Sequence, residues 1–416
     1  MKKAAIIIIS LTAGAILGWS IYANSQVTTK SSHTQKEAAF STSKQHLEKH
    51  SVDTLEKEVK AMSLEDKTAQ LLMVGFEGST LSKKEEAMIQ QGHVGGVILL
   101  GRNVQSEGQL QSLVTSIRSA NTNSAPLFIG IDEEGGRVSR IPSTLPNLPS
   151  SEQIGEQEDS DLSFQTGQAL AQKVKQYGIN MDFAPVLDIN NNPDNEVIGD
   201  RSFGSTPEKV SKLGMATMNG IRSEGVVPVV KHFPGHGDTS VDSHAQLPVI
   251  DKSVDTLRSF EWVPFQKAIQ AGADAIMTAH ILFPALDEEV PATFSKEIIS
   301  GVLREQMDYQ GLIITDDMAM GAIANNYGTT EAAIQAVEAG VDMVMLTDTR
   351  QNQFQDVHDG LVNAVEKGKI AEEQINQSVM RILSLKQKYE LSSAPEEVNE
   401  EKLKSTISTI RERVRE

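Results

Sequence analysis

Two segments of the chain combine residue types that could cleave a bond by proton transfer and nucleophilic attack. The first is a glycine-punctuated run, KHFPGHGDTSVDSH, at residues 231–244. Histidine titrates near neutral pH, and Asp242 could hold the tautomer of His244 and stabilise its protonated form. This pair could protonate a leaving oxygen and later activate water. On spacing alone, the same histidine could instead be structural or a metal ligand.

The second segment ends in a candidate nucleophile. Asp316 follows the apolar run GLIIT at residues 311–315, so a buried strand would present its carboxylate with a fixed backbone behind it. Carboxylates attack the anomeric carbon in retaining glycoside hydrolysis and form a covalent glycosyl-enzyme. The competing interpretation of Asp316 is a helix cap. Asp317 comes next and should point away, so we assign it the capping role.

A third motif, DEEGGRVSR at residues 132–140, has acids before two glycines and arginines after them. Charged side chains of this kind form bidentate hydrogen bonds to vicinal sugar hydroxyls. We therefore expect one sugar-binding pocket to gather Asp132, Arg140, Arg201 and Lys231. Any of these could instead form an ion pair at the rim, and Arg137 is the residue we expect to do so.

A zinc site is an alternative for the histidine-rich run. The residues that could surround the metal are His232, His236, Asp242 and His244. Metal-dependent barrel hydrolases usually also have ligands after the first strand, and residues 71–77 contain no pair of histidines. We therefore expect no metal and no cofactor.

Eight short apolar runs alternate with helical patterns, which is typical of parallel βα units. The runs are Leu71–Phe76, Val94–Leu100, Leu127–Ile131, Ile179–Phe183, Val226–Val230, Ala273–Thr278, Leu312–Thr315 and Val341–Leu346. Intervening segments such as Leu162–Tyr177 and Thr330–Ala339 have apolar residues at helical spacing. The pattern predicts an α/β fold, a (β/α)8 TIM barrel, with a doubly wound open sheet as the competitor.

The residues just after these runs favour the barrel. Arg102 and Asn103, Asp132, Lys231 and His232, His280, Asp316, and Asp348 each follow a run. Catalytic groups of a TIM barrel collect at the carboxyl ends of its strands. If polar residues only marked the points where strands leave the core, Asp, His, Lys and Arg would not be favoured over Ser, Gly or Asn.

The termini and the composition predict the domain organisation and the compartment. Residues 1–25 resemble an export signal, cleaved or retained as a membrane anchor. Residues 26–51 should form a disordered linker, 52–390 the catalytic barrel, and 391–416 a helical tail. There is no cysteine, and 56 acidic residues against 38 basic ones give a net charge of -18, which disfavours nucleic acid.

Several motifs together resemble glycoside hydrolase family 3, and within it the β-N-acetylglucosaminidase branch of the NagZ type. They are residues 231–244, 314–320, 132–140, 184–188, 199–204 and 291–293. The resemblance covers about Thr54 to Tyr389 and implies a TIM barrel. Many Gram-positive relatives carry a further α/β/α domain, which we do not expect in this chain.

The resemblance also implies residue roles. Asp316 would be the nucleophile, and Asp242 with His244 the acid/base dyad. The terminal N-acetylglucosamine would be held by Asp132, Arg140, Arg201, Lys231 and His232.

The implied substrate is a peptidoglycan-derived saccharide, from which GlcNAc is released at the non-reducing end of GlcNAc-MurNAc units. The enzyme would act outside the cell, secreted or tethered to the outer face of the cytoplasmic membrane. It would contact membrane only through an uncleaved N-terminal segment, and we expect a monomer. The alternatives are a phosphorylase that transfers the sugar to phosphate, a β-glucosidase of the same broad family, and an exported sugar-binding protein without catalysis.

Overall fold

The computed structural model describes residues 53–123, 125–142, 145–239, 247–347, 353–392 and 397–415. The chain divides into two compact units, Met1–Lys60 and Ala61–Glu416. In the first unit, residues 53–60 are helical, while the expected export signal and linker lie outside the described residues. The second unit contains the barrel. In the described part of the chain, no helix is both long and apolar enough to span a membrane.

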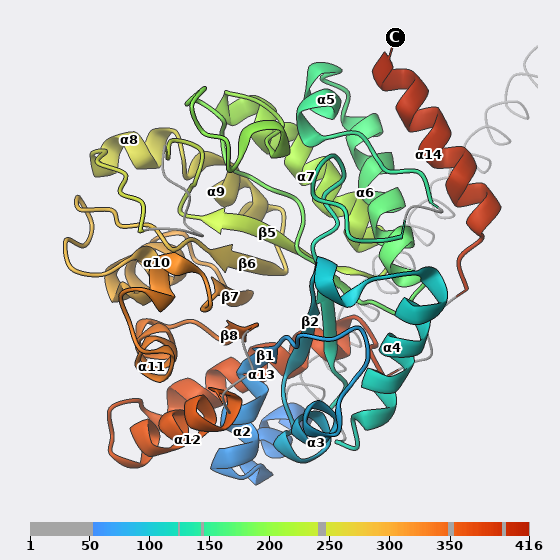
Figure 1. Cartoon of the computed structure of the whole chain (residues 1–416). Helices are drawn as coiled ribbons and strands as arrows, with labels where there is room; N and C mark the ends of the chain where they lie inside the picture. The colour runs from blue at the N-terminus through green and yellow to red at the C-terminus, as the bar shows by residue number, and fades with distance from the viewer. Residues whose placement is uncertain are drawn as a thin grey trace, which may run out of the picture. The chain divides into compact units, whose positions relative to one another are not determined.

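Eight parallel strands form a closed barrel in which each strand pairs with the next in the sequence and β8 pairs with β1 (Figure 1). The strands are β1 (Leu72–Val74), β2 (Gly96–Leu99), β3 (Phe128–Ile131), β4 (Met181–Asp182), β5 (Val227–Phe233), β6 (Ala275–Thr278), β7 (Leu312–Asp317) and β8 (Met343–Leu346). Each of the eight overlaps one of the apolar runs. The predicted TIM barrel is confirmed, and the open sheet is excluded.

Helices surround this ring of strands (Figure 1). Before β4 they are α2 (Leu64–Gln70), α3 (Lys83–Gly92), η1 (Gly101–Asn103), α4 (Glu107–Ala120), α5 (Ser151–Glu156) and α6 (Ser160–Lys175). Between β4 and β7 they are η2 (Gly199–Arg201), α7 (Pro207–Ser223), α8 (Val254–Ser259), α9 (Val263–Gln270), η3 (Ala292–Phe294) and the π-helix η4 (Glu297–Gln306). After β7 come α10 (Gly321–Ala324), α11 (Thr329–Ala339), α12 (Gln353–Glu366), α13 (Glu372–Lys388) and α14 (Glu400–Arg415).

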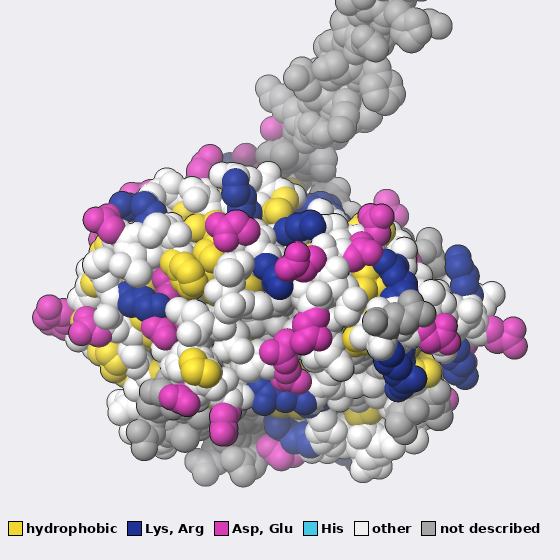
Figure 2. All heavy atoms as spheres, turned by 90° about the horizontal axis from the view of Figure 1, so that it is seen from above, with side chains coloured by type: hydrophobic (Ala, Val, Ile, Leu, Met, Phe, Trp, Pro, Cys, Tyr) yellow, Lys and Arg dark blue, Asp and Glu magenta, His cyan; other side chains and the backbone are white. Residues whose placement is uncertain are grey.

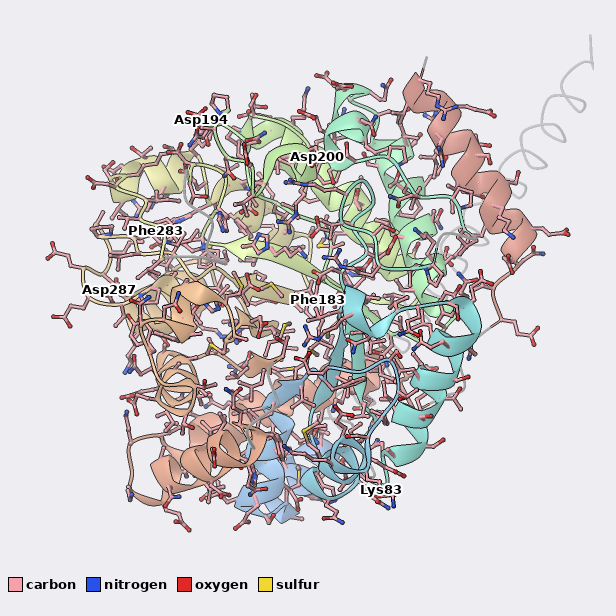
Figure 3. All side chains as sticks on the ribbon, viewed as in Figure 1. Lys83, Phe183, Asp194, Asp200, Phe283 and Asp287 are labelled. Carbon is pink, nitrogen blue, oxygen red and sulfur yellow. The ribbon has the colours of Figure 1, made fainter. Side chains whose placement is uncertain are left out.

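The strands are mostly apolar, except at their carboxyl ends, because helices cover their outer side while side chains fill the barrel. Phe183, labelled near the centre of Figure 3, is fully buried among them.

Two glycines allow α6 and α7 to pack closely. A Cβ at Gly167 would lie 2.2 Å from the carbonyl oxygen of Thr217, and one at Gly220 would lie 2.1 Å from that of Phe164. Any larger residue at either position would push the helices apart.

β5 and β7 extend further than their apolar runs predict. β5 continues through Lys231 and His232 to Phe233, and β7 continues through Asp316 to Asp317. The pairing register shifts between Val230 and Phe233 and again between Ile314 and Asp317. Polar residues that the sequence places after the strands are therefore part of them, which gives their side chains a rigid backbone.

The tail helix α14 packs against α6. Leu403, Ile407 and Ile410 are buried, and Arg413 pairs with Asp159 at the start of α6. On the face shown in Figure 2, acidic and basic side chains are interspersed rather than gathered in patches of one sign. The charges on this face therefore form no continuous basic surface.

Candidate active site

A pocket of about 910 Å³ opens at the carboxyl ends of the strands. All of the predicted sugar-binding residues and the predicted nucleophile line it: Asp132, Arg140, Arg201, Lys231, His232 and Asp316. They come from β5, β7 and the segments that follow β3 and β4. The barrel thus brings together residues that are up to 184 positions apart (316 minus 132).

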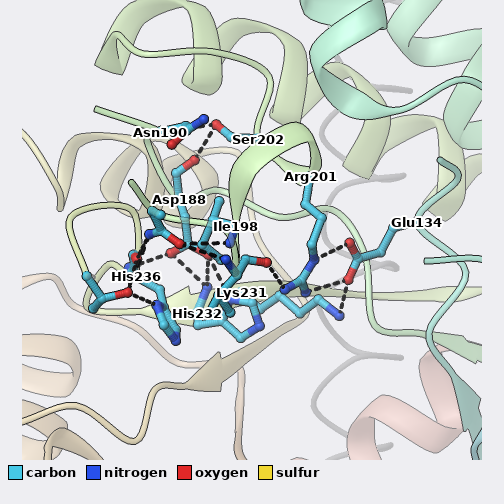
Figure 4. Close-up of polar contacts among 12 residues, drawn as sticks. Glu134, Asp188, Asn190, Ile198, Arg201, Ser202, Lys231, His232 and His236 are labelled. Atoms are coloured by element: carbon cyan, nitrogen blue, oxygen red, sulfur yellow. Dashed lines mark hydrogen bonds and ion pairs between the residues drawn. The ribbon is translucent and has the colours of Figure 1, made fainter. Parts of the chain in front are cut away.

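Four of the charged side chains form one network on a wall of the pocket. Lys231 Nζ lies 2.6 Å from Asp132 Oδ1 and 2.7 Å from Glu134 Oε1. Glu134 also accepts two hydrogen bonds from Arg201, through Nε and Nη2, each 2.8 Å long (Figure 4). This bidentate geometry fixes both partners.

The network keeps its members charged. Burial alone would raise the pKa of Glu134, but Arg201 and Lys231 outweigh burial and hold the pKa far below its usual value. Burial alone would lower the pKa of Lys231, whereas Asp132 and Glu134 raise it. The pocket wall therefore offers fixed anionic acceptors and cationic donors to sugar hydroxyls at neutral pH.

One guanidinium nitrogen of Arg140 has no hydrogen-bond partner in the described structure. Its backbone N–H donates to Glu133 Oε2 at 2.8 Å, which anchors the residue. Its Nε is buried and has no hydrogen-bond partner within the part of the chain that the structure describes. A buried donor without a partner is costly, so a pocket-lining arginine in this state is poised to bind a ligand oxygen.

Asp316 lies half-buried at the pocket and carries a negative charge. Its Oδ1 accepts a hydrogen bond of 2.8 Å from the backbone N–H of Asp317. Burial alone would raise the pKa of Asp316, but the nearby His232 and His280 reverse this and lower it below the usual aspartate value. An ionised carboxylate at the end of a strand is the form that attacks carbon.

His280 supports the peptide that follows Asp316. Its Nε2 lies 3.1 Å from the carbonyl oxygen of Asp317, and its Nδ1 lies 2.9 Å from Thr293 Oγ1. Burial lowers the pKa of His280, so the ring is neutral at neutral pH. Since a carbonyl oxygen only accepts, Nε2 must carry the proton.

The position and the role of Asp317 differ from those predicted from the sequence. It lines the pocket instead of pointing away, and it caps no helix, because α10 begins only at Gly321. Its carboxylate accepts hydrogen bonds from the backbone N–H of Thr347, at 3.2 Å, and from the Thr347 hydroxyl. The register shift between β7 and β8 overrides simple strand alternation and turns the side chain toward β8.

Arg137 forms the rim ion pair that we expect from the sequence. Its Nε lies 2.9 Å from Oδ1 of Asp200, which is labelled in Figure 3, and both side chains are exposed. Its Nη2 also donates to the carbonyl of Glu196 at 2.7 Å. Arg137 therefore fixes the loop that follows β4 at the edge of the pocket.

Sequence reasoning missed two buried carboxylates, Glu134 and Asp188. Asp188 Oδ2 lies 2.7 Å from His232 Nδ1, and its Oδ1 accepts a 2.7 Å hydrogen bond from the backbone N–H of His236. Both carboxylates lie inside motifs that we noted. The signal that could have found Glu134 is charge balance, since the predicted pocket cations Lys231 and Arg201 need buried counterions.

Asp242 and His244, the predicted acid/base dyad, lie outside the described residues. The zinc alternative includes both of them and stays open. Within the described residues, no three metal-ligating side chains form a candidate site. The Nδ1 atoms of His232 and His236 face Asp188 and Thr239.

A closed barrel whose mouth holds an ionised carboxylate beside a charged pocket with an unsatisfied arginine is typical of TIM-barrel glycoside hydrolases. The family described as "Glycosyl hydrolase family 3 N terminal domain" matches residues 63–385. The chain therefore belongs to glycosyl hydrolase family 3.

Curated relatives and solved structures agree on the branch. The chain is 37% identical over 341 residues to the beta-hexosaminidase A of Pseudoalteromonas piscicida, covering 76% of this chain and 57% of the relative. It is 39% identical over 282 residues to a beta-hexosaminidase of Nitrosomonas eutropha, covering 66% and 80%. A family 3 β-N-acetylglucosaminidase from a Paenibacillus species superimposes with a TM-score of 0.80 at 39% identity, covering 85% and 69%.

The chain thus falls in the β-N-acetylhexosaminidase branch of the family and is a glycoside hydrolase. It spans a little over half of the length of the Pseudoalteromonas relative.

Proposed function

We propose that the protein is an exported, retaining exo-β-N-acetylglucosaminidase that removes GlcNAc from the non-reducing end of peptidoglycan fragments such as GlcNAc-MurNAc. The observation that carries this proposal is the position of ionised Asp316 in the same pocket as the Asp132, Lys231, Glu134 and Arg201 network. The names of the relatives support the choice of N-acetylhexosaminide over glucoside.

In the first step the terminal sugar binds to Asp132, Arg140, Arg201, Lys231 and His232. Asp316 then attacks the anomeric carbon and forms an ester bond to it while the glycosidic C–O bond breaks. His244, paired with Asp242, gives its proton to the leaving oxygen. In the second step His244 takes a proton from water, the hydroxide adds to the anomeric carbon, and the carboxylate of Asp316 is released.

The choice of peptidoglycan fragments follows the family resemblance. The pocket is lined by acidic as well as basic side chains, among them Asp194 and Glu196 beside Arg102 and Arg137, so its charge alone does not select a sugar that carries a carboxylate. The N-terminal export signal expected from the sequence would bring the enzyme to such fragments.

The test compares protein lacking residues 1–25 with its Asp316→Asn and His244→Ala variants on chromogenic β-GlcNAc and β-glucose substrates. We expect turnover of the β-GlcNAc substrate only. Asp316→Asn should lower kcat by roughly a thousandfold or more, because the amide is a poor nucleophile. His244→Ala should lose most activity against poor leaving groups.

Rapid acid quenching followed by peptide mass spectrometry should find one N-acetylhexosamine bound to Asp316. Wild-type activity in Asp316→Asn, or an adduct on another residue, would contradict the assignment. Preferred turnover of β-glucose would support the β-glucosidase instead.

The same assay separates hydrolysis from phosphorolysis. A histidine that has lost its proton is uncharged and repels incoming phosphate less than a carboxylate would, so the products must be identified with and without phosphate. We expect free GlcNAc under both conditions. Sugar phosphate as the main product would make the enzyme a phosphorylase.

A further inference from the structure

Asp188 is a buried carboxylate that contacts His232 and His236, two residues that line the sugar pocket. Only 1% of the residue is exposed. Its oxygens accept hydrogen bonds from His232 Nδ1 at 2.7 Å, from the backbone N–H of His232 at 3.3 Å, and from the backbone N–H of His236 at 2.7 Å (Figure 4). One carboxylate thus holds both ends of the turn that leaves β5.

The carboxylate is ionised. Burial alone would raise the pKa of Asp188, but His232 and His236 outweigh burial and lower it. A carboxylate without a proton can only accept hydrogen bonds, so Nδ1 of His232 must carry a hydrogen. The ring of His232 is therefore held in one orientation and with a defined protonation at Nδ1.

The opposite ring nitrogen is the one that can serve the substrate. His232 lines the pocket beside Lys231 and Asp316, and its Nδ1 edge is turned toward Asp188. Nε2 is then the polar ring atom that can face the pocket. A sugar hydroxyl both donates and accepts hydrogen bonds, so it can pair with Nε2 in either protonation state.

The backbone of Asp188 is itself anchored to a second sugar-binding residue. The hydroxyl of Ser202 donates to the carbonyl oxygen of Asp188 at 2.6 Å. Ser202 follows directly on Arg201, the last residue of η2. The segment with Asp188 therefore connects the positions of His232, on β5, and Arg201, in η2 after β4.

We propose that Asp188 is a positioning residue for catalysis: it holds His232 with Nδ1 toward the barrel wall so that Nε2 meets a hydroxyl of the bound sugar. Asp188 itself does not touch the substrate. The inference rests on the proposed function, because it assigns the sugar to this pocket. None of our assigned sugar contacts includes Asp188.

Two measurements test the inference, and the first needs no turnover. Nitrogen-15 NMR of the histidine side chains, with His232 assigned by its loss in His232→Gln, should show Nδ1 of His232 protonated in the wild-type protein. In Asp188→Asn this signature should change. A wild-type His232 that carries its proton on Nε2 alone would overturn the inference, even if the enzyme hydrolyses β-GlcNAc as proposed.

The second measurement is a double-mutant cycle on the chromogenic β-GlcNAc substrate. Asp188→Asn should lower kcat/KM by about ten- to a hundredfold, the effect of losing one buried hydrogen bond to a charged group. In the His232→Gln background, Asp188→Asn should lower kcat/KM by less than about threefold, because Asp188 acts through His232. Equal losses in both backgrounds would show a purely structural role and refute the inference.

Asp255→Asn is the matched control, since it makes the same chemical change at a side chain that is 95% exposed on α8. It should retain wild-type kinetics. Should Asp188→Asn fail to fold, the NMR signature of the wild-type protein decides alone. A wild-type enzyme without β-GlcNAc activity but with Nδ1 protonated would refute the proposed function and leave the orientation of His232 established.

Discussion

At the scale of single residues, the pocket depends on carboxylates that neutralise buried cations. The side chain of Glu134 is only 3% exposed and that of Lys231 only 2%. Glu134 holds both Lys231 and Arg201, so it determines where two of the proposed sugar-binding groups point. Its role is therefore indirect but large, because an unpaired buried charge is expensive.

Glu134→Gln should raise KM and lower kcat/KM about ten- to a hundredfold. The glutamine amide has the shape of the Glu134 carboxylate but not its charge, and its NH2 group would face Lys231 or Arg201. Michaelis kinetics on the chromogenic β-GlcNAc substrate measures the effect. Glu208→Gln, an exposed change in the first turn of α7, is the control. An unchanged KM in Glu134→Gln would show that the network does not order the sugar-binding groups.

At the scale of elements, a helix holds the loop that carries Asp132 and Arg140. Lys173 of α6 pairs with Glu133 at 2.5 Å, and their side chains are 1% and 0% exposed. Glu133 also accepts hydrogen bonds from Ser139 Oγ and from the backbone N–H groups of Arg140 and Ile141. The pair therefore transmits the position of α6 to the pocket.

Lys173→Met should destabilise the protein by about 3–5 kcal/mol, because Glu133 is left as an uncompensated buried charge. Urea unfolding measures the loss. Adding Glu133→Gln should recover part of it, since the double variant no longer buries an unpaired ion. Lys212→Met, on the exposed face of α7, should change stability by no more than about 0.5 kcal/mol. A Lys173→Met variant as stable as this control would contradict the prediction.

At the scale of the whole barrel, the end opposite the pocket contains a buried lysine without a carboxylate partner in the described structure. Lys386 of α13 donates to Gln70 Oε1 at 2.8 Å, and its Nζ lies 5.2 Å from the centre of the Phe128 ring. Burial lowers the pKa of Lys386 to about 7. The folded protein therefore loses this proton about three pH units before the unfolded chain does.

Lys386 should make stability depend on pH. Between about pH 7 and pH 10 the unfolded chain binds this proton and the folded protein does not, so this residue's contribution to stability rises with pH in that window and is constant below it. Lys386→Met removes the effect. Its free energy of unfolding relative to wild type should be highest at pH 7 and below, and should fall steadily toward pH 10.

Urea unfolding at pH 6, 7, 8 and 9 measures this difference. The exposed Lys367→Met is the control and should show a difference that is independent of pH over this range. A flat difference for Lys386→Met as well would mean that Lys386 keeps an ordinary pKa in the folded protein.

The strands were predictable because a parallel barrel buries both faces of each strand, so every strand appears as a short uninterrupted apolar run. Predicting the pocket residues required one further step, that polar side chains at the carboxyl ends of the strands share one rim. Asp132, Lys231, His232 and Asp316 all follow from it. The assignment of Arg140 and Arg201 to the pocket depended on their sequence motifs alone.

The sequence by itself thus determined the barrel, its rim and the residue types gathered there. Only the tertiary structure decided which charges pair. Glu134 with Arg201, Asp188 with His232 and Asp317 with Thr347 are separated by 67, 44 and 30 positions. Local hydrophobic pattern carries no information about such pairs, because their partners are set by strand register and by loops that meet only when the barrel closes.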